Sequence, residues 1–150
     1  MRIYLVVMDE TPEALTALRF ASLRAAKTGG SVHIVALVPQ QTFNAFGSVQ
    51  ATIEGEARDR AEVIANDAAG NIFQEMGKLP VIAVRPGPPA DVVRRYIEEH
   101  GDIAALVLGI AAEGGPGPLV AHFAAHAGDL PCPLYLIPAA LAGEALDRLA

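Results

Sequence analysis

Two neighbouring carboxylates, Asp9 and Glu10, directly follow the apolar run Ile3–Met8. A carboxylate at the end of a strand could accept a hydrogen bond from a ribose hydroxyl, or hold a metal ion together with its neighbour. The same residue could serve a structural purpose instead, because the helix dipole favours an acidic side chain ahead of a helix. The residues alone leave both interpretations open.

A glycine-rich segment runs from Gly109 to Gly117 and ends just before Pro118. Backbone N–H groups of glycines ahead of a helix can approach a phosphate group closely. Pro116 and Pro118 have no N–H to offer, Glu113 would repel an anion, and no lysine follows as in a Walker-type loop. The segment is therefore either a ligand cradle or a plain connection, and the glycines to inspect are Gly109, Gly114, Gly115 and Gly117.

Other reactive residue types lack the companions that their chemistry needs. His122 and His126 lie four apart on an expected helix, which is metal-ligand spacing, but no third ligand is evident, so we predict no metal site. Cys132 has neither a base nor an activating charge nearby in the sequence. We predict a structural thiol and no catalytic residue.

The elements that must position these residues alternate between apolar runs and helical periods. Strands are expected at 3–8, 32–38, 81–84, 104–108 and 134–137, with a loop at 40–49 and a helix from Ile53 to Met76 that could bend at Gly70. Alternating strands and helices predict a parallel sheet covered on both faces. Ligands of such sheets bind beyond the carboxyl ends of the strands, which directs attention to the residues there: Asp9, Val38-Pro39, Arg85, Gly109 and Pro138.

Composition narrows the classes of partner and compartment. The chain of 150 residues is 52% hydrophobic with a net charge of -6, and no basic run exceeds Arg94-Arg95, so we expect no nucleic-acid partner. The single cysteine is typical of a reducing compartment, and the opening apolar run is too short for a signal peptide or a membrane span. We therefore expect a cytoplasmic protein with no membrane partner.

Four segments in the right order resemble the universal stress protein family, over nearly the whole chain. They are the opening strand with its terminal Asp9, the segment Gly87–Val93 (G-x-P-x-x-x-[IL] in the family), the run Leu106–Gly109, and Pro131–Ile137 (P-C-P-V-hydrophobic in the family). The resemblance implies a single three-layer α/β domain of the adenine-nucleotide-hydrolase-like type, with a five-stranded parallel sheet of order 3-2-1-4-5. It would span residues 1–138, followed by a tail, 139–150, that could hold a short helix.

The resemblance also implies a site and a partner. ATP-binding members have G-x2-G-x9-G-[ST] after the fourth strand. Here Gly109 fits the first glycine, Ala112 replaces the second, and His122-Phe123 or Val120-Ala121 replaces the final pair. The family implies a homodimer through the last strand, Leu134–Ile137. The positions expected to contact ATP or AMP are Asp9, Val38, Gly87, Gly109, Gly114, Gly115 and Gly117.

Four functions follow as alternatives. The first is a non-enzymatic, dimeric stress or regulatory protein whose nucleotide loop is degenerate, and the second is an ATP- or AMP-binding protein with a variant glycine-rich loop. The third, an enzyme on a related nucleotide-hydrolase fold, needs a glycine-rich loop after the first strand, where Asp9–Pro12 stands instead. The fourth, a phosphoacceptor receiver domain, lacks an Asp at Val84-Arg85 and a Lys in the last strand.

Overall fold

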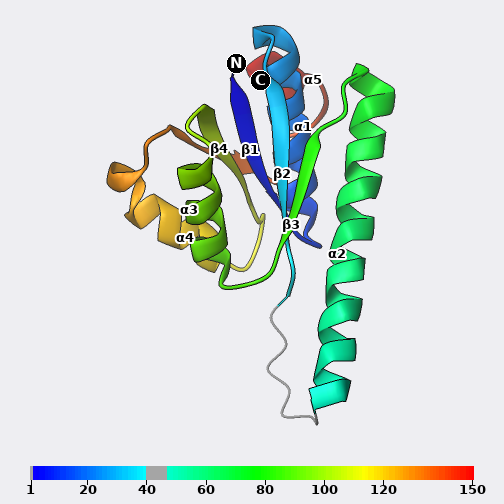
Figure 1. The fold of residues 1–150 in the computed structure, drawn as a ribbon. Helices are drawn as coiled ribbons and strands as arrows, with labels where there is room; N and C mark the ends of the chain where they lie inside the picture. The colour runs from blue at the N-terminus through cyan, green and yellow to red at the C-terminus, as the bar shows by residue number, and fades with distance from the viewer. Residues whose placement is uncertain (1, 40–46) are drawn as a thin grey trace.

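Five parallel strands form one sheet at the centre of the molecule (Figure 1). The computed structural model describes residues 2–39 and 47–150, with side chains described for 2–39 and 53–150. The strands are β1 (Ile3–Met8), β2 (Ser31–Leu37), β3 (Val81–Arg85), β4 (Ile103–Ile110) and β5 (Leu134–Pro138). Their order, β3-β2-β1-β4-β5, and their parallel pairing confirm the predicted topology.

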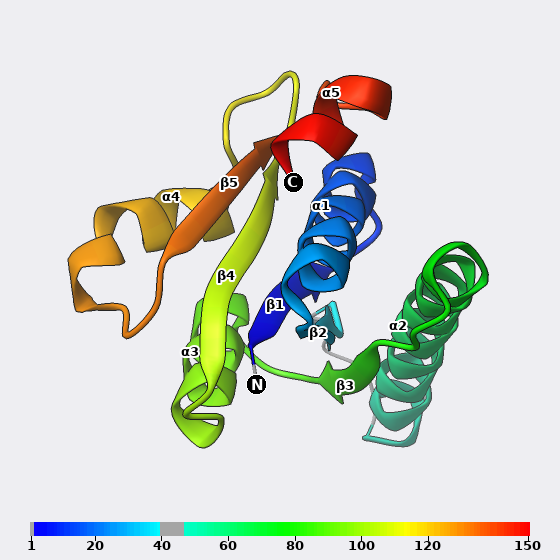
Figure 2. The same ribbon diagram turned by 90° about the horizontal axis from the view of Figure 1, so that it is seen from above.

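Helices cover both faces of the sheet, which confirms the predicted three layers. They are α1 (Pro12–Thr28), α2 (Gly47–Met76), α3 (Pro89–Glu99), α4 (Pro118–Ala125) and α5 (Gly143–Leu149), with a short 3-10 turn at Ala127–Asp129. Figure 2 shows α1, α2 and α5 on one face and α3 and α4 on the other. Because all the strands are parallel, each helical connection returns the chain to the end of the sheet at which the strands begin.

Two hydrophobic cores lie on the two faces, and β1 contributes to both. Tyr4, Val6 and Met8 pack toward α1 and α2, whereas Ile3, Leu5 and Val7 pack toward α3 and α4. Successive side chains of a strand point to opposite faces, so an unbroken apolar run is what a strand between two cores requires. The run Ile3–Met8 is buried along its whole length.

Two element boundaries differ from the sequence prediction by two residues or more, and several others by one residue. Helix α2 begins at Gly47, so residues 47–49 are helical and not loop, while the remainder of the expected loop lies outside the described residues. The start of α2 projects past the sheet, where no apolar period is needed because no sheet lies beneath it (Figure 1). Strand β4 continues through Gly109 and Ile110, which pair with Ile137 and Pro138 of β5.

Helix α2, with 30 residues, is held to the sheet by small side chains and to the β1–α1 connection by charge. Its buried face includes Ala61 and Ala65, and the Arg60 guanidinium forms an ion pair with the Glu10 carboxylate. Neither α2 nor any other helix in the described ranges has the length and apolar character that crossing a bilayer demands.

The segment after β5 docks on α1 through its final helix. Leu146 and Ala150 of this segment are buried, and the Lys27 ammonium donates hydrogen bonds to the carbonyl oxygens of Asp147 (2.7 Å) and Ala150 (2.8 Å). A cation at the carboxyl end of a helix also complements its dipole.

A cluster of aromatic and imidazole rings joins β2 to α3, away from the carboxyl ends of the strands. The Tyr96 hydroxyl lies 2.7 Å from Nδ1 of His33, and the Tyr96 ring stacks on His100 with centroids 4.0 Å apart. Burial, together with the nearby charge of His100, lowers the pKa of His33, while Asp102 acts weakly in the opposite direction. The folded protein therefore favours neutral His33.

This cluster predicts a loss of stability in mild acid. The unfolded chain protonates His33 near pH 6.5 and the folded chain only at lower pH, so the unfolded state binds more protons between the two pKa values. The stabilising contribution is present above pH 6.5 and declines as the pH falls through the folded pKa. Urea unfolding from pH 8 to 5 should show a smaller acid loss for His33→Asn, whose amide cannot ionise. Parallel curves for the two proteins would contradict this assignment.

Candidate functional site

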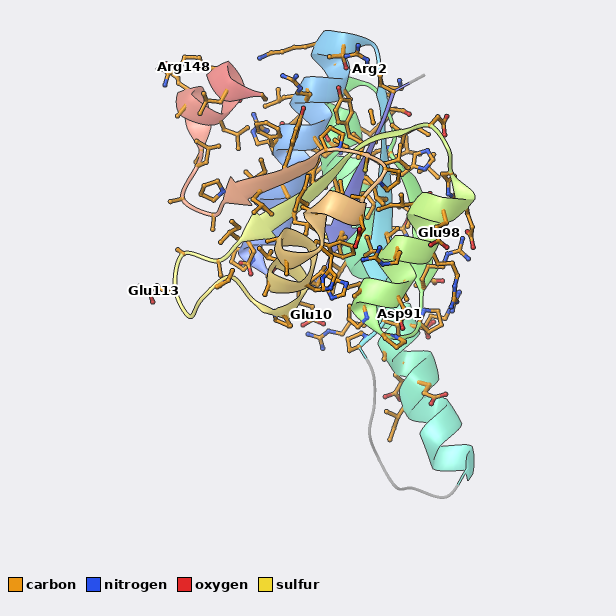
Figure 3. All side chains as sticks on the ribbon, turned by 90° about the vertical axis from the view of Figure 1, so that its left-hand side faces the viewer. Arg2, Glu10, Asp91, Glu98, Glu113 and Arg148 are labelled. Atoms are coloured by element: carbon orange, nitrogen blue, oxygen red, sulfur yellow. The ribbon has the colours of Figure 1, made fainter. Side chains whose placement is uncertain are left out.

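A cavity of about 580 Å³ opens beyond the carboxyl ends of β1 and β4, where the strand order reverses. This volume lies within the range of roughly 300–1,000 Å³ that is typical of small-molecule sites. The walls come from the ends of β1, β2 and β4 and from the starts of α1, α3 and α4. Figure 3 shows this end of the molecule, with Glu10 just after β1 and Asp91 in the first turn of α3. The lining residues are Val7, Asp9, Thr11, Glu13, Ala14, Leu37, Pro88, Pro89, Ala90, Leu108, Gly109, Pro116, Gly117, Pro118, Leu119, Val120 and His122.

Asp9 lines this cavity with its carboxylate held in place by Thr11. The Thr11 backbone N–H donates to Asp9 Oδ1 at 3.0 Å, and the Thr11 hydroxyl donates to the same oxygen. Thr11 also precedes the first residue of α1, but its own side chain makes no capping hydrogen bond. The structural and ligand-binding interpretations of Asp9 are thus compatible, because Oδ1 holds the turn while Oδ2 has no hydrogen-bond partner among the described residues.

Gly109 also lines the cavity, and its immediate role is to let α1 approach β4. A Cβ built at this position would lie 2.0 Å from the carbonyl oxygen of Glu13 and 2.8 Å from the Glu13 Cβ. Real side chains never approach a backbone oxygen so closely, so only glycine fits. Gly109 thereby places the first turn of α1, with Glu13 and Ala14, against the cavity.

The glycine-rich loop divides into a part at the cavity and a part away from it. Gly117 lines the cavity, whereas Gly114 and Gly115 are exposed and lie outside the lining. All three have φ near +82°, a region that favours glycine, and nothing lies within 4 Å of a Cβ built on them. Glu113 marks the loop tip and points away from the sheet (Figure 3). The tip of the loop therefore extends outward (Figure 3), while Pro116 and Gly117 reach the cavity.

Val38 and Gly87 lie next to the cavity lining but not in it. The buried Val38 donates its N–H to the Arg85 carbonyl oxygen at 3.2 Å, and the preceding residue, Leu37, lines the cavity. Leu37 packs with the α3–α4 core, whereas Ala36 faces α1 and α2. The cavity lies on the α3–α4 face, so strand alternation favours Leu37. Gly87, at φ +121°, turns the chain so that Pro88–Ala90 form a wall.

The sequence prediction omitted several residues that line the cavity. Pro88, Pro89 and His122 were not among the expected ligand-contacting positions, although all three line the cavity. The helical period could have placed His122 one turn into α4, whereas the choice between Leu37 and Val38 requires knowing on which face of the sheet the cavity lies. His122 and His126 do share a face, with ring centroids 4.5 Å apart. Within the described ranges, no three metal-binding side chains come together.

A comparison with protein-family models decides the family. The model described as the universal stress protein family matches residues 1–138. The chain belongs to the universal stress protein family. A search of curated proteins gave no significant match.

Solved universal stress proteins share the fold at low sequence identity. The protein UspA from Lactobacillus plantarum is 18% identical with a TM-score of 0.73, and the match covers 91% of this chain and 97% of that one. A family member from Burkholderia pseudomallei is 20% identical with a TM-score of 0.72, covering 91% and 95%. A family protein from Arabidopsis thaliana, solved with AMP bound, is 16% identical with a TM-score of 0.62, covering 97% and 98%.

The two pairs of residues that the resemblance aligns with the Gly-[ST] pair of ATP-binding members have different surroundings in this universal stress protein. His122 lines the cavity, whereas Phe123 is fully buried in the core between the sheet and α4. In the other register, Val120 is buried at the cavity wall and Ala121 is exposed. No hydroxyl occupies the start of α4 in either register, so any phosphate contact there must involve other groups.

Proposed function

We propose that this universal stress protein is a non-enzymatic regulator that binds an adenine nucleoside monophosphate and holds a triphosphate only weakly. The observation that supports it most directly is the 580 Å³ cavity with Asp9 at the strand-order switch. The similar protein from Arabidopsis thaliana was solved with AMP bound, and AMP is an adenine nucleoside monophosphate. The lining is mainly apolar, as expected for a wall that holds a base, with a few polar groups that orient the ligand.

Weak triphosphate binding follows from the loop. Pro116 and Pro118 cannot donate hydrogen bonds, and Gly114 and Gly115 lie outside the lining, so few backbone N–H groups face the cavity from this side. A purely protein-binding role with an empty cavity is the second candidate, and these two prolines are the observation that favours it.

The proposal assigns binding and no chemical step. The one cysteine, Cys132, is half-buried, and burial raises the pKa of its thiol. A raised pKa leaves little thiolate at neutral pH, so Cys132 is a poor nucleophile. A single reduced cysteine also suits a cytoplasmic location, which forms part of the proposal.

Native mass spectrometry tests the ligand class without prior choice of compound. The protein purified from its own cells should retain an adenine nucleotide or bind added AMP. Either result appears as a mass increase of one adenine nucleotide per chain. A retained ligand of another class, or no adduct with excess AMP, would contradict the proposal.

We propose further that the protein is a homodimer formed through β5. This strand forms one edge of the sheet, and Leu134–Ile137 gives it an apolar sequence. The Leu106 N–H donates to the Pro133 carbonyl oxygen and the Ala139 N–H donates to Ile110, so alternation directs the Leu136 N–H outward from the sheet. An exposed apolar edge is a template for pairing with another strand.

Amide hydrogen exchange distinguishes the dimer from a monomer. The Leu136 amide should exchange slowly at high protein concentration and much faster on dilution, because only the partner strand would protect it. The Ala139 amide, bonded within the sheet to Ile110, is the internal control and should not respond to dilution. Exchange at Leu136 that is independent of concentration, together with a monomeric sedimentation coefficient, would refute the dimer.

A further inference from the structure

The cavity has one side chain that can become positively charged, and it comes from α4. Of the described lining residues, only His122 is basic, while Asp9 and Glu13 provide carboxylates from the β1–α1 wall. A ligand that fits this distribution has hydroxyl or amino donors for the carboxylates and a small anionic group for the imidazole. Two carboxylates opposed by a single imidazole would not suit a highly charged anion.

Arg94 of α3 stands behind His122 and strengthens the positive end of the cavity. Arg94 Nη2 lies 3.4 Å from His122 Nε2. An anionic oxygen placed beside both nitrogens could make a hydrogen bond to each of them. Arg94 lies one helical turn after Ala90, which lines the cavity, so the guanidinium and the cavity wall belong to the same face of α3. Both groups are partly shielded from solvent, which strengthens their charge interactions.

Packing holds both side chains in position without an ion pair to a carboxylate. The Arg94 guanidinium lies over the ring of Phe123, 5.7 Å from its centroid, and Phe123 is fully buried. His122 stacks on His126 on its own helix. Arg94 forms no salt bridge among the described residues, so its charge remains available to an incoming anion.

We infer that His122 and Arg94 form the contact for a single phosphate group, and that this pair makes the cavity selective for a nucleoside monophosphate over the triphosphate. The inference rests on the proposed nucleotide function and assigns its anion-binding residues. One imidazole backed by one guanidinium matches the charge of one phosphate. The loop, with Pro116 and Pro118, offers few donors for a second and a third.

Isothermal titration calorimetry of the full chain with AMP and adenosine tests the inference. His122→Ala should lower the AMP affinity about tenfold, the loss expected for a hydrogen bond to a charged group, and leave adenosine binding within about twofold. Arg94→Met keeps the aliphatic stem over Phe123 and should lower AMP affinity selectively as well. Arg95→Met is the matched control for the loss of a positive charge, because Arg95 is exposed on α3 and lies outside the lining, and it should bind AMP as the wild type does.

The outcomes separate this inference from the function on which it rests. Wild-type AMP affinity in both His122→Ala and Arg94→Met would overturn the phosphate contact while leaving the nucleotide function intact. Equal losses of AMP and adenosine affinity would also overturn it, since they indicate a change in cavity shape and not in anion binding. A wild-type protein that binds neither ligand would overturn both.

Discussion

Gly109→Ala should lower the free energy of unfolding by about 3 kcal/mol, at the upper end of the usual cost of overpacking. The new methyl group would lie 2.0 Å from the Glu13 carbonyl oxygen, so the first turn of α1 must move away from β4. Backbone atoms yield less readily than the end of a flexible side chain, which is why a single carbon has so large an effect. Urea unfolding monitored by circular dichroism measures the change.

Gly101→Ala is the matched control for this substitution. Gly101 lies just before β4, its φ is not in the left-handed region, and nothing lies within 4 Å of a Cβ built there. The control should unfold within about 0.5 kcal/mol of the wild type, as surface substitutions generally do. If Gly109→Ala were equally harmless, α1 could not pack on β4 as described.

Asp9→Ala should weaken AMP binding by at least about tenfold, because the carboxylate at the strand-order switch would no longer accept ligand hydrogen bonds. Asp9→Asn separates charge from shape: its side-chain oxygen can still accept from Thr11 and hold the turn, but the second carboxylate oxygen is replaced by an NH₂ group. We expect Asp9→Asn to remain as stable as the wild type and to bind AMP nearly as poorly as Asp9→Ala. Calorimetric titration with AMP gives the affinities.

Glu10→Gln controls for the loss of one negative charge at the same end of the sheet. Glu10 pairs with Arg60 of α2 and does not line the 580 Å³ cavity. Its neutralisation should leave AMP affinity within about twofold of the wild type, since exposed charges contribute little to a neighbouring site. An equal loss in Glu10→Gln and Asp9→Asn would assign the effect to net charge and remove Asp9 from the site.

The fold was predictable because its signals are local and mutually consistent. The unbroken run Ile3–Met8 predicts a strand buried on both faces, and the strand–helix alternation predicts the parallel sheet. Gly109 was the exception. Glycine is a common turn signal, yet here it lies within β4, and its lack of a side chain lets α1 pack closely against the strand. Such a close approach is a property of the packed fold, and no local pattern in the sequence reveals it.

The candidate site was predictable where a residue lies at or near the carboxyl end of a strand or in the glycine-rich segment. Asp9 follows β1 directly, Gly109 lies near the end of β4 and Gly117 ends the glycine-rich segment, and all three line the cavity. Leu37 and Val38 differ by one residue, and their assignment depends on which face the cavity occupies. The pairing of His122 with Arg94 joins two helices far apart in sequence, so only the packing of α3 against α4 brings it to light.

The measurement that tests the central claim most directly is calorimetric titration of the wild-type protein with AMP and, separately, with ATP. We predict one AMP bound per chain with a dissociation constant on the order of micromolar, and ATP bound roughly tenfold more weakly. ATP binding as tight as or tighter than AMP binding would contradict the proposed loss of triphosphate contacts. The absence of binding heat with millimolar AMP, confirmed by no adduct in native mass spectrometry, would contradict the nucleotide site itself.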